Sequence, residues 1–447
     1  MNKKKPKINH SYLIVGFGFE GRFVYGYLRK KYPLAEIAIA DQKKMVAPDK
    51  KIKMYYGKNY LERTEDYAVI IKSQGVPPHL KQLRTAKKAG RVITSLTKIF
   101  FKECRGKILG VTGTKGKSST ASLIYEILKQ AGLKVFLVGN IGHNPLSHLG
   151  ENRGKDKIFV YELSSHQLAD LRQSPKIAVF LDIFPDHMPW HGSYKKYQLA
   201  KANIAKYQRP NDYFIYNSSY PFIKNLASSS LAKKVDYQER CNIKNGDIYY
   251  GGQKIVSVNK IKLLGRHNLE NIFACISAAK IFKIENKIIA QAISSFKGLK
   301  HRLEFVKEIK GVGYYDDAIS TTPESTLAAI NVFGDKLGTI FLGGLDRGYN
   351  FDRLALKLHK IKISNIVLFP NSGEAIWQSL KKIYILKRTA LPKKFFTANM
   401  GKAVKFAYKN TAPGHACLLS TASPSYGIFK NYIEKGNLFK KEALKLK

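Results

Sequence analysis

The segment 110–120, GVTGTKGKSST, combines glycines with lysines and hydroxyl side chains in an order suited to binding phosphate. It departs from the common phosphate-binding pattern G-x-x-x-x-G-K-[ST], because Val111 stands where that pattern needs its first glycine. Lys117 can reach a terminal phosphate, Ser118 can ligate Mg²⁺, and backbone N–H groups at the start of a helix bind anions. The segment therefore predicts a nucleotide site, with an ordinary turn between a strand and a helix as the alternative.

Two later apolar runs also end in side chains that can do chemistry. Glu162 ends the run KIFVYE, and His187 follows the run KIAVFLDIF, ahead of a helical segment that carries Lys201. A carboxylate at the carboxyl end of a parallel strand faces the ligand crevice, so Glu162 is a candidate for a metal-bound phosphate site. Helix capping by Ser164 is the alternative for that segment. We expect His187 to bind metal or phosphate and His191 to be structural.

Strand-like runs alternate with helical ones along the 447 residues, which is typical of parallel sheets covered by helices. The length suggests roughly three domains at about 150 residues each. We predict an α/β protein of three such domains: a Rossmann-like domain at 1–104, a central P-loop-type ATPase domain at 105–299 and a Rossmann-like domain at 300–447. In the first, the pattern G-x-G-x-x-G at 16–21, with Asp41 about 20 residues on, is typical of a turn that holds a phosphate-bearing ligand.

The composition is strongly basic, with 77 Lys and Arg against 32 Asp and Glu and a net charge of +45. These lysines are spread over the whole chain instead of forming one block with aromatic residues, so we predict no specific nucleic-acid function. Weak binding to anionic polymers is expected on electrostatic grounds.

Other classes are disfavoured by what the sequence lacks. No apolar run reaches the roughly 18–20 residues of a membrane span, and the start MNKKKPKINH has no apolar segment typical of a signal peptide. The four cysteines lie far apart, which favours neither a zinc site nor disulfides and fits a reducing cytoplasm.

Taken together, the polar segments resemble the Mur ligases, and among these the members that add glutamate to a UDP-sugar carrying alanine. The resemblance rests on GVTGTKGKSS, ELSSHQL, DHMPWHGSYKKYQLAK, GRHNLEN, HRLEF, DDAISTTPEST, LGGLDRG and LSTASPSYGIFKNYIEKG, which occur in the order seen in that family. It implies an enzyme of peptidoglycan precursor synthesis, an ATP-dependent amide ligase that works through an acyl phosphate. Its substrates would be UDP-N-acetylmuramoyl-L-alanine, glutamate and ATP, and it would be a monomer that uses two Mg²⁺ ions.

The same resemblance assigns roles to individual residues. For ATP it implies Gly113, Thr114, Lys115, Gly116, Lys117, Ser118, Ser119, Asn271, Arg302 and Asp317. For Mg²⁺ it implies Ser118, Glu162, His187 and Lys201, the last as a carbamylated lysine, and for catalysis Lys117, His187 and Lys201. For the UDP-sugar it implies Gly18, Phe19, Asp41, Ser73 and Asn140, and for the amino acid Arg347, Ser425 and Tyr432.

One position departs from the family pattern. Members that add glutamate commonly have a lysine where this chain has Ile319. Arg347 can compensate, since a guanidinium binds carboxylate in a bidentate manner. The choice between D- and L-glutamate stays open, as do another Mur or folylpolyglutamate-type ligase and, more remotely, a basic nucleic-acid-binding ATPase.

Overall fold

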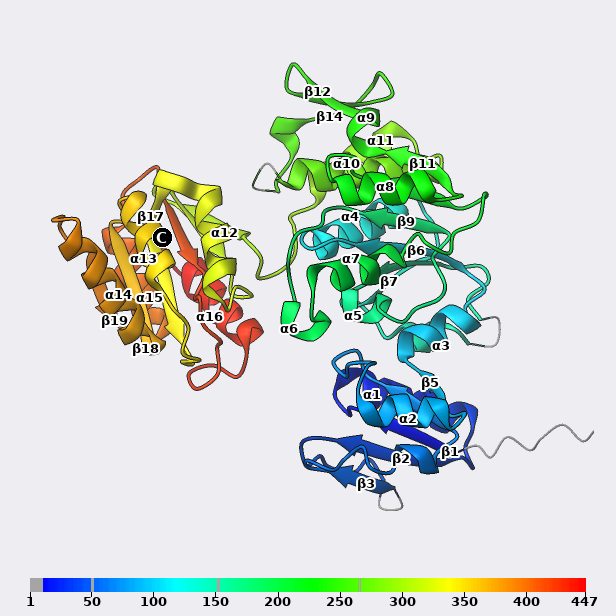
Figure 1. Ribbon diagram of the computed structural model, residues 1–447. Coiled ribbons are helices and arrows are strands. Elements are labelled where there is room, and N and C mark those ends of the chain that lie inside the picture. Colours follow the sequence, from blue (N-terminus) through cyan, green and yellow to red (C-terminus); the bar gives the residue numbers. More distant parts are fainter. Residues whose placement is uncertain (1–10, 50–51, 151–152, 264, 266) are drawn as a thin grey trace, which may run out of the picture. The chain divides into compact units, whose positions relative to one another are not determined.

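The computed structural model describes residues 11–49, 52–150, 153–263, 265 and 267–447, and its chain divides into two compact units (Figure 1). The first unit comprises 1–261 and 267–294, and the second comprises 262–266 and 295–447. The basic start of the chain, residues 1–10, lies outside the described residues. The predicted α/β class is confirmed, because the three large sheets are mostly parallel and carry helices.

The first sheet belongs to the first unit and has the strand order β3-β2-β1-β4-β5, with every neighbouring pair parallel. Its strands are β1 (Ser11–Val15), β2 (Glu36–Asp41), β3 (Lys53–Tyr56), β4 (Val69–Lys72) and β5 (Val92–Thr94). The accompanying helices are α1 (Phe19–Lys31), α2 (Lys81–Lys88) and α3 (Leu96–Glu103). The central strand β1 is buried along its whole length, as expected for an apolar strand covered on both faces.

The second sheet, also in the first unit, has six parallel strands in the order β11-β10-β9-β6-β8-β7. These are β6 (Lys107–Thr112), β7 (Val135–Gly139), β8 (Ile158–Glu162), β9 (Ile177–Phe180), β10 (Tyr213–Tyr216) and β11 (Lys233–Asp236). The helices are α4 (Lys117–Gln130), α5 (Ser165–Leu168), α6 (Met188–His191), α7 (Tyr194–Ala202), α8 (Pro221–Ser229), α9 (Tyr237–Arg240), α10 (His267–Ile281) and α11 (Asn286–Ser295).

A small antiparallel sheet extends the first unit. It consists of β12 (Cys241–Lys244), β13 (Asp247–Tyr250) and β14 (Gln253–Ser257). The polar segment 233–247 suggests a surface hairpin or loop, which is right for β12 and β13 but wrong for its first residues. Those form β11, whose pairing with β10 no local pattern of charged residues could indicate.

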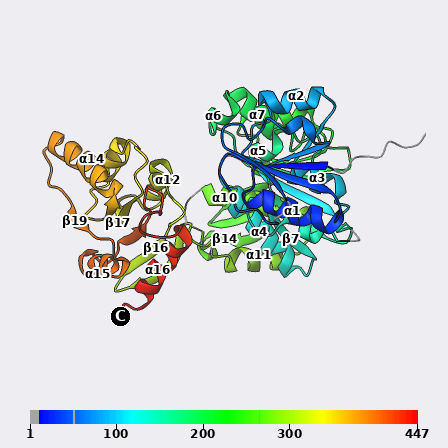
Figure 2. The same cartoon turned by 90° about the horizontal axis from the view of Figure 1, so that it is seen from below.

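The second unit contains one sheet in the order β15-β16-β20-β17-β18-β19, parallel except for β15. Its strands are β15 (Glu304–Ile309), β16 (Val312–Asp316), β17 (Leu337–Gly344), β18 (Asn365–Asn371), β19 (Lys393–Phe396) and β20 (Ala416–Leu419). Its helices are α12 (Pro323–Phe333), α13 (Asp352–Lys360), α14 (Ser372–Leu386), α15 (Met400–Asn410) and α16 (Tyr432–Leu444). Figure 2 shows α12 and α14 over one face of this sheet and α15 and α16 over the other, each side with its own apolar core.

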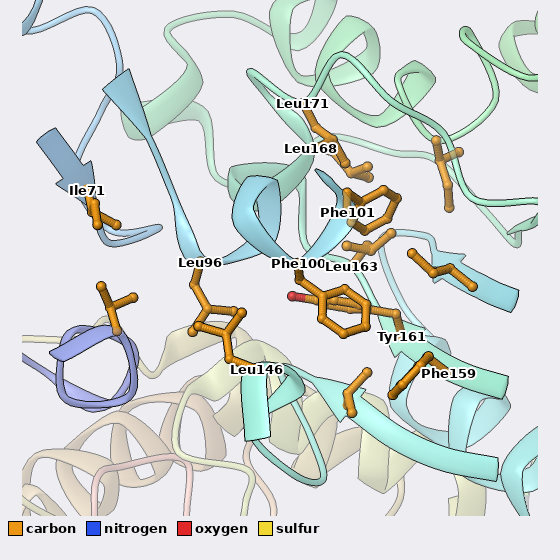
Figure 3. Packing of buried hydrophobic residues seen from close by; sticks show 14 of the residues in the cluster. Ile71, Leu96, Phe100, Phe101, Leu146, Phe159, Tyr161, Leu163, Leu168 and Leu171 are labelled. Carbon is orange, nitrogen blue, oxygen red and sulfur yellow. The ribbon is translucent and has the colours of Figure 1, made fainter. Parts of the chain in front are cut away.

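The two parallel sheets of the first unit share a continuous apolar core. Phe100 on α3 is fully buried and packs edge-on against Phe159 and Tyr161 of β8, with ring centroids 5.0 and 5.5 Å away. Figure 3 shows this cluster, in which Ile71 of the first sheet and Leu146 also take part. Helix α3 thus anchors the first sheet to the second through aromatic packing.

Candidate active site

The phosphate-binding segment forms the turn from β6 to α4, as its sequence predicts. Gly116, directly before α4, has a φ of +77°, a conformation that glycine adopts without strain. A Cβ at this position would also lie 2.4 Å from Oδ1 of Asn271, so the close approach requires a glycine. Asn271, predicted to bind nucleotide, is buried on α10 and therefore lies against the loop.

Lys117 lies in the first turn of α4 and folds back over the loop. Its Nζ donates to the main-chain oxygens of Gly113 at 3.0 Å and of Thr114 at 2.9 Å. Burial lowers the pKa of this lysine, while the carboxylates of Glu162 and Asp182 oppose that shift. The ammonium group is thus held at the centre of a loop whose backbone N–H groups and glycines suit a phosphate.

Asp182, which was not singled out in the sequence, fixes the shape of this loop. Its Oδ1 accepts the N–H of Thr114 at 2.5 Å and the N–H of Lys115 at 2.9 Å. Burial raises the pKa of the carboxyl, and these two hydrogen bonds act in the opposite direction. The available signal was its position two residues after β9, in FLDIF, where a carboxylate at a strand end commonly faces a ligand.

A cavity of about 360 Å³ adjoins the loop and gathers several predicted residues. It is lined by Gln74, Gly75, Thr114, Lys117, Asn140, Ser164, Ser165, His166, Asp186, His187, Tyr197 and Lys201. The predicted sugar contact Asn140 and the predicted catalytic residues Lys117, His187 and Lys201 therefore meet in one place.

Lys201 is almost fully buried, with 1% of its surface exposed. Its Nζ donates to the main-chain oxygen of Gly113 at 2.6 Å and to Oγ1 of Thr112 at 3.2 Å. Burial, and then the neighbouring charge of Lys117, hold the pKa of Lys201 well below its usual range. This setting shifts the lysine toward the neutral amine, which is the nucleophilic form.

Glu162 supplies a buried oxygen that suits a cation. The residue is 3% exposed, and within the described residues its Oε2 has no hydrogen-bond partner. A buried carboxylate oxygen without a partner is costly, whereas Mg²⁺ prefers oxygen ligands of this kind. The charge of Glu162 acts on both Lys117 and Lys201, and Ser118 follows Lys117 in the first turn of α4. The donor set therefore fits Mg²⁺.

His187 precedes α6 with a φ of +56°, and its side chain is 53% exposed. Its ring centroid lies 5.0 Å from that of His166, a residue that the sequence patterns did not indicate as part of a site. His191 is buried and its Nε2 lies 3.0 Å from Oγ of Ser165, in agreement with the structural role expected for it. The Ser164 hydroxyl caps α5 by accepting the N–H of Gln167, so the capping explanation of this segment holds, while the nearby Glu162 carboxylate is buried.

A second cavity of about 720 Å³ is lined by all five residues predicted to contact the UDP-sugar. They are Gly18, Phe19, Asp41, Ser73 and Asn140. Asn140, Gln74 and Gly75 line this cavity and also the smaller one beside the loop, so the two cavities share a boundary. A ligand in the larger cavity could reach the phosphate-binding loop past these residues.

Two of these residues also hold the turn after β1 in shape. Asp41 accepts the N–H of Phe17 at 2.7 Å, and Ser73 donates its hydroxyl to the main-chain oxygen of Gly16 at 2.6 Å. The glycine pattern and Asp41 therefore lie together, as the sequence predicts.

In the second unit, Asp317 is buried behind the end of β16. It accepts hydrogen bonds from Oγ of Ser420 at 2.8 Å and from the N–H of Leu303 at 3.2 Å. Burial raises the pKa of Asp317 to about 6. Arg302, the other nucleotide residue predicted here, is exposed, and its positive charge acts against that shift.

Two of the three residues predicted to bind the amino acid, Arg347 and Ser425, lie on loops that meet within this unit. The N–H of Leu345 donates to the main-chain oxygen of Pro424 at 2.8 Å, which joins the loop of the exposed Arg347 to that of Ser425. The Ser425 hydroxyl is buried without a partner among the described residues. Tyr432 starts α16, where its ring centroid lies 6.0 Å from that of His301.

Lys435 is a buried cation in the second unit that the sequence did not reveal. Its Nζ donates to Oγ1 of Thr421 at 2.5 Å. Burial lowers the pKa of Lys435 to about 7, against the opposing effect of Asp316 and Asp317. Nothing in the local pattern IEKG distinguishes it from the many exposed lysines, because its burial arises only when α16 packs on the sheet.

Comparison with known proteins identifies the family. Residues 111–279 match the Mur ligase middle domain. A protein of Geobacillus kaustophilus named UDP-N-acetylmuramoylalanine–D-glutamate ligase is 34% identical over 390 residues, covering 86% of this chain and 84% of its own. The chain belongs to the Mur ligase family. Two relatives of the same name support this assignment. The one from Acetivibrio thermocellus is 32% identical and covers 98% of this chain and 97% of the relative. The one from Streptococcus pneumoniae is 31% identical and covers 87% of this chain and 86% of the relative.

Solved structures of Mur ligases share the fold. The UDP-N-acetylmuramate-alanine ligase MurC of Thermotoga maritima superposes with a TM-score of 0.57 at 16% identity, covering 97% of this chain and 99% of that one. MurF ligase of the same organism, in complex with ADP, superposes with a TM-score of 0.56 at 17% identity, covering 99% of this chain and 100% of that one. The resemblance to Mur ligases read from the sequence is thus confirmed, and the chain is an enzyme of the ligase class. Mur ligases use ATP and Mg²⁺. Across the described residues, none of the helices combines the length and apolarity needed to cross a bilayer.

Proposed function

We propose that this Mur ligase joins glutamate, in its D form, to UDP-N-acetylmuramoyl-L-alanine in peptidoglycan precursor synthesis, converting ATP to ADP and phosphate. The relatives that match most of the chain carry this activity in their names. The observation that carries the proposal is the boundary shared by the two cavities at Asn140, Gln74 and Gly75. It lets one elongated substrate extend from the first sheet to the phosphate-binding loop.

The proposal assigns one ligand to each of three domains, 1–104, 105–299 and 300–447. The first binds the UDP-sugar and the second binds ATP through residues 113–119 and Asn271. The third contributes Arg302 and Asp317 to the nucleotide and holds the amino acid. We further propose a monomeric cytoplasmic enzyme.

The chemistry of amide formation from a carboxylate requires activation by ATP. The alanine carboxylate attacks the γ-phosphorus, the bond to the β-phosphate oxygen breaks, and an acyl phosphate forms with release of ADP. The glutamate amine then attacks the acyl carbon, loses a proton, and phosphate leaves with the former carboxylate oxygen. Lys117 neutralises charge on the transferred group, and the loop orients it in line with the attacking oxygen.

Two Mg²⁺ ions would offset the charge of the phosphates. Ser118 would hold one, and Glu162, His187 and Lys201 the other. Lys201 would serve as an oxygen ligand once its neutral amine has attacked CO₂ and lost a proton, which leaves an anionic carbamate. Support comes from the burial that lowers the pKa of Lys201 and from the buried oxygen of Glu162 that lacks a partner among the described residues.

Replacing Arg347 with alanine is expected to raise the KM for glutamate by about 10- to 100-fold, because one charge-assisted contact to a carboxylate is lost. The KM for ATP should change far less. Steady-state kinetics with each substrate varied in turn makes the comparison. Arg353→Ala, an exposed arginine on α13 in the same unit, is the matched control and should leave both constants unchanged. An unchanged glutamate KM in Arg347→Ala would place the acceptor elsewhere.

Position 319 tests the stereochemical part of the proposal. Ile319 is partly buried, and its N–H donates to the main-chain oxygen of His301 at 3.1 Å. We expect Ile319→Lys to tighten D-glutamate or to shift the preference between D- and L-glutamate, since a cation is added where family members commonly have one. If the kinetic constants for D-glutamate and for L-glutamate are the same in Ile319→Lys as in the wild-type enzyme, residue 319 does not belong to the acceptor site.

A substrate panel separates the proposed function from its alternatives. Purified protein receives ATP and Mg²⁺ with UDP-N-acetylmuramoyl-L-alanine and either D- or L-glutamate, or with a folate and L-glutamate, and products are identified by mass. D-glutamate ligation to the UDP-sugar is expected. Product only with L-glutamate or only with folate would replace the proposal. ATP hydrolysis stimulated by nucleic acid, with a steep salt dependence, would instead favour the basic ATPase.

A further inference from the structure

A third cavity of the first unit, of about 790 Å³, is separate from the two cavities described above. Its volume falls in the range of roughly 300–1,000 Å³ that is typical of small-molecule sites. Trp190 and His191 of α6, the short helix that follows His187, form part of its wall. The proposed reaction assigns no ligand to it.

The charged residues in the wall of this cavity are almost all cations. Seven of its lining residues are lysine or arginine, and its one carboxylate, Asp170, already pairs with Lys98 at 2.7 Å. The remaining six form no ion pair within the described part of the chain: Arg84, Lys87, Arg91, Arg172, Lys196 and Lys206. Gathering six like charges around one concave surface raises the local potential and concentrates anions there.

These cations come from different parts of the sequence. Arg84 and Lys87 lie on α2, whereas Lys196 lies on α7 and Lys206 follows that helix. The fold therefore brings these cations together, and they do not belong to the solvated face of a single helix.

Two basic side chains at or beside this wall extend into the interior, and burial lowers the pKa of one of them, Lys72. The Nε of Arg91 is buried without a hydrogen-bond partner among the described residues. Lys72 is 2% exposed, and Asp170 and Lys98 are among the charges that act on it, which places it close to this wall.

We propose that this cavity binds a small multiply charged phosphate compound at a site separate from the phosphate-binding loop. The six cations supply its charge-assisted hydrogen bonds. A concave surface favours a soluble polyanion over a flat anionic membrane, which would meet only the rim.

Calorimetric titration with inorganic tripolyphosphate, without Mg²⁺ and at about 0.15 M salt, tests the proposal, since weak surface attraction is largely screened at that ionic strength. The wild-type protein should show two binding events. The double variant Lys87→Ala/Lys206→Ala, which removes one exposed cation from each side of the cavity, should weaken one event by about tenfold or more. Lys117→Ala should retain that same event and lose the other.

The matched control is Lys402→Ala/Lys405→Ala, which removes two exposed lysines from α15 and changes the net charge equally. It should leave both events intact. A single event that disappears in Lys117→Ala, or equal weakening in both double variants, would overturn the proposal. A third result would also overturn the proposal: Lys87→Ala/Lys206→Ala loses binding to phosphatidylcholine–phosphatidylglycerol vesicles but binds tripolyphosphate as the wild-type protein does.

Discussion

Lys117→Ala is expected to lower the ligation rate by about 10²–10³-fold or more, the range seen when one preorganised group that stabilises transition-state charge is removed. Lys117 is held over the loop by the main-chain oxygens of Gly113 and Thr114. When phosphate arrives, the ammonium group can leave those oxygens and pair with the anion at little cost in reorganisation. Initial rates of ADP release measured with saturating substrates give the comparison.

The fold should survive this change, because alanine is a strong helix former in the first turn of α4. Circular dichroism and the melting temperature check this. Lys129→Ala, near the end of the same helix and exposed, is the control and should keep normal turnover. Near-normal turnover in Lys117→Ala would remove this loop from the ATP site.

Lys201→Ala is the second change expected to have a very large effect, again about 10²–10³-fold on turnover, because it would delete the carbamate that we propose as an anionic ligand beside the transferred phosphate. Added acetate or formate should restore part of the activity by placing a carboxylate in the space left. The wild-type enzyme should gain activity with bicarbonate and lose it when CO₂ is removed. Since burial lowers the pKa of Lys201, this gain should persist at pH values where exposed lysines are fully protonated.

The control for this second change lies on the same helix. Lys195→Ala removes an exposed lysine of α7 and should affect neither the rate nor its response to bicarbonate. Mass spectrometry under CO₂ should detect one added carbamate in the wild-type protein and none in Lys201→Ala. Full activity of Lys201→Ala without any carboxylate would make the lysine a bystander.

The sequence predicted those features that local patterns encode. The glycine loop, the strand before it and the helix after it follow from residue spacing alone. The UDP-sugar residues were implied by the resemblance to the Mur ligases, and the structure places most of them at strand ends, which meet at one edge of a parallel sheet. All five line one cavity.

Other features depend on packing between distant segments and left no local signal. Lys435 and Lys72 look like any other lysine in a chain with 77 Lys and Arg, and only the fold makes them buried. The boundary at Gln74 and Gly75 and the cation-lined cavity likewise depend on how the first sheet packs on the second. Strand β11 likewise forms because it pairs with β10, since its own charged residues do not indicate a strand.

The central claim, ATP-driven ligation of glutamate through an acyl phosphate, is tested most directly with UDP-N-acetylmuramoyl-L-alanine labelled with oxygen-18 in its carboxylate. The protein is supplied with this substrate, D-glutamate, ATP and Mg²⁺, and the phosphate and the ligated product are analysed by mass. The account predicts one amide product for each ADP, with a single labelled oxygen transferred to phosphate. Absence of the D-glutamate product, or product accompanied by unlabelled phosphate, would contradict it.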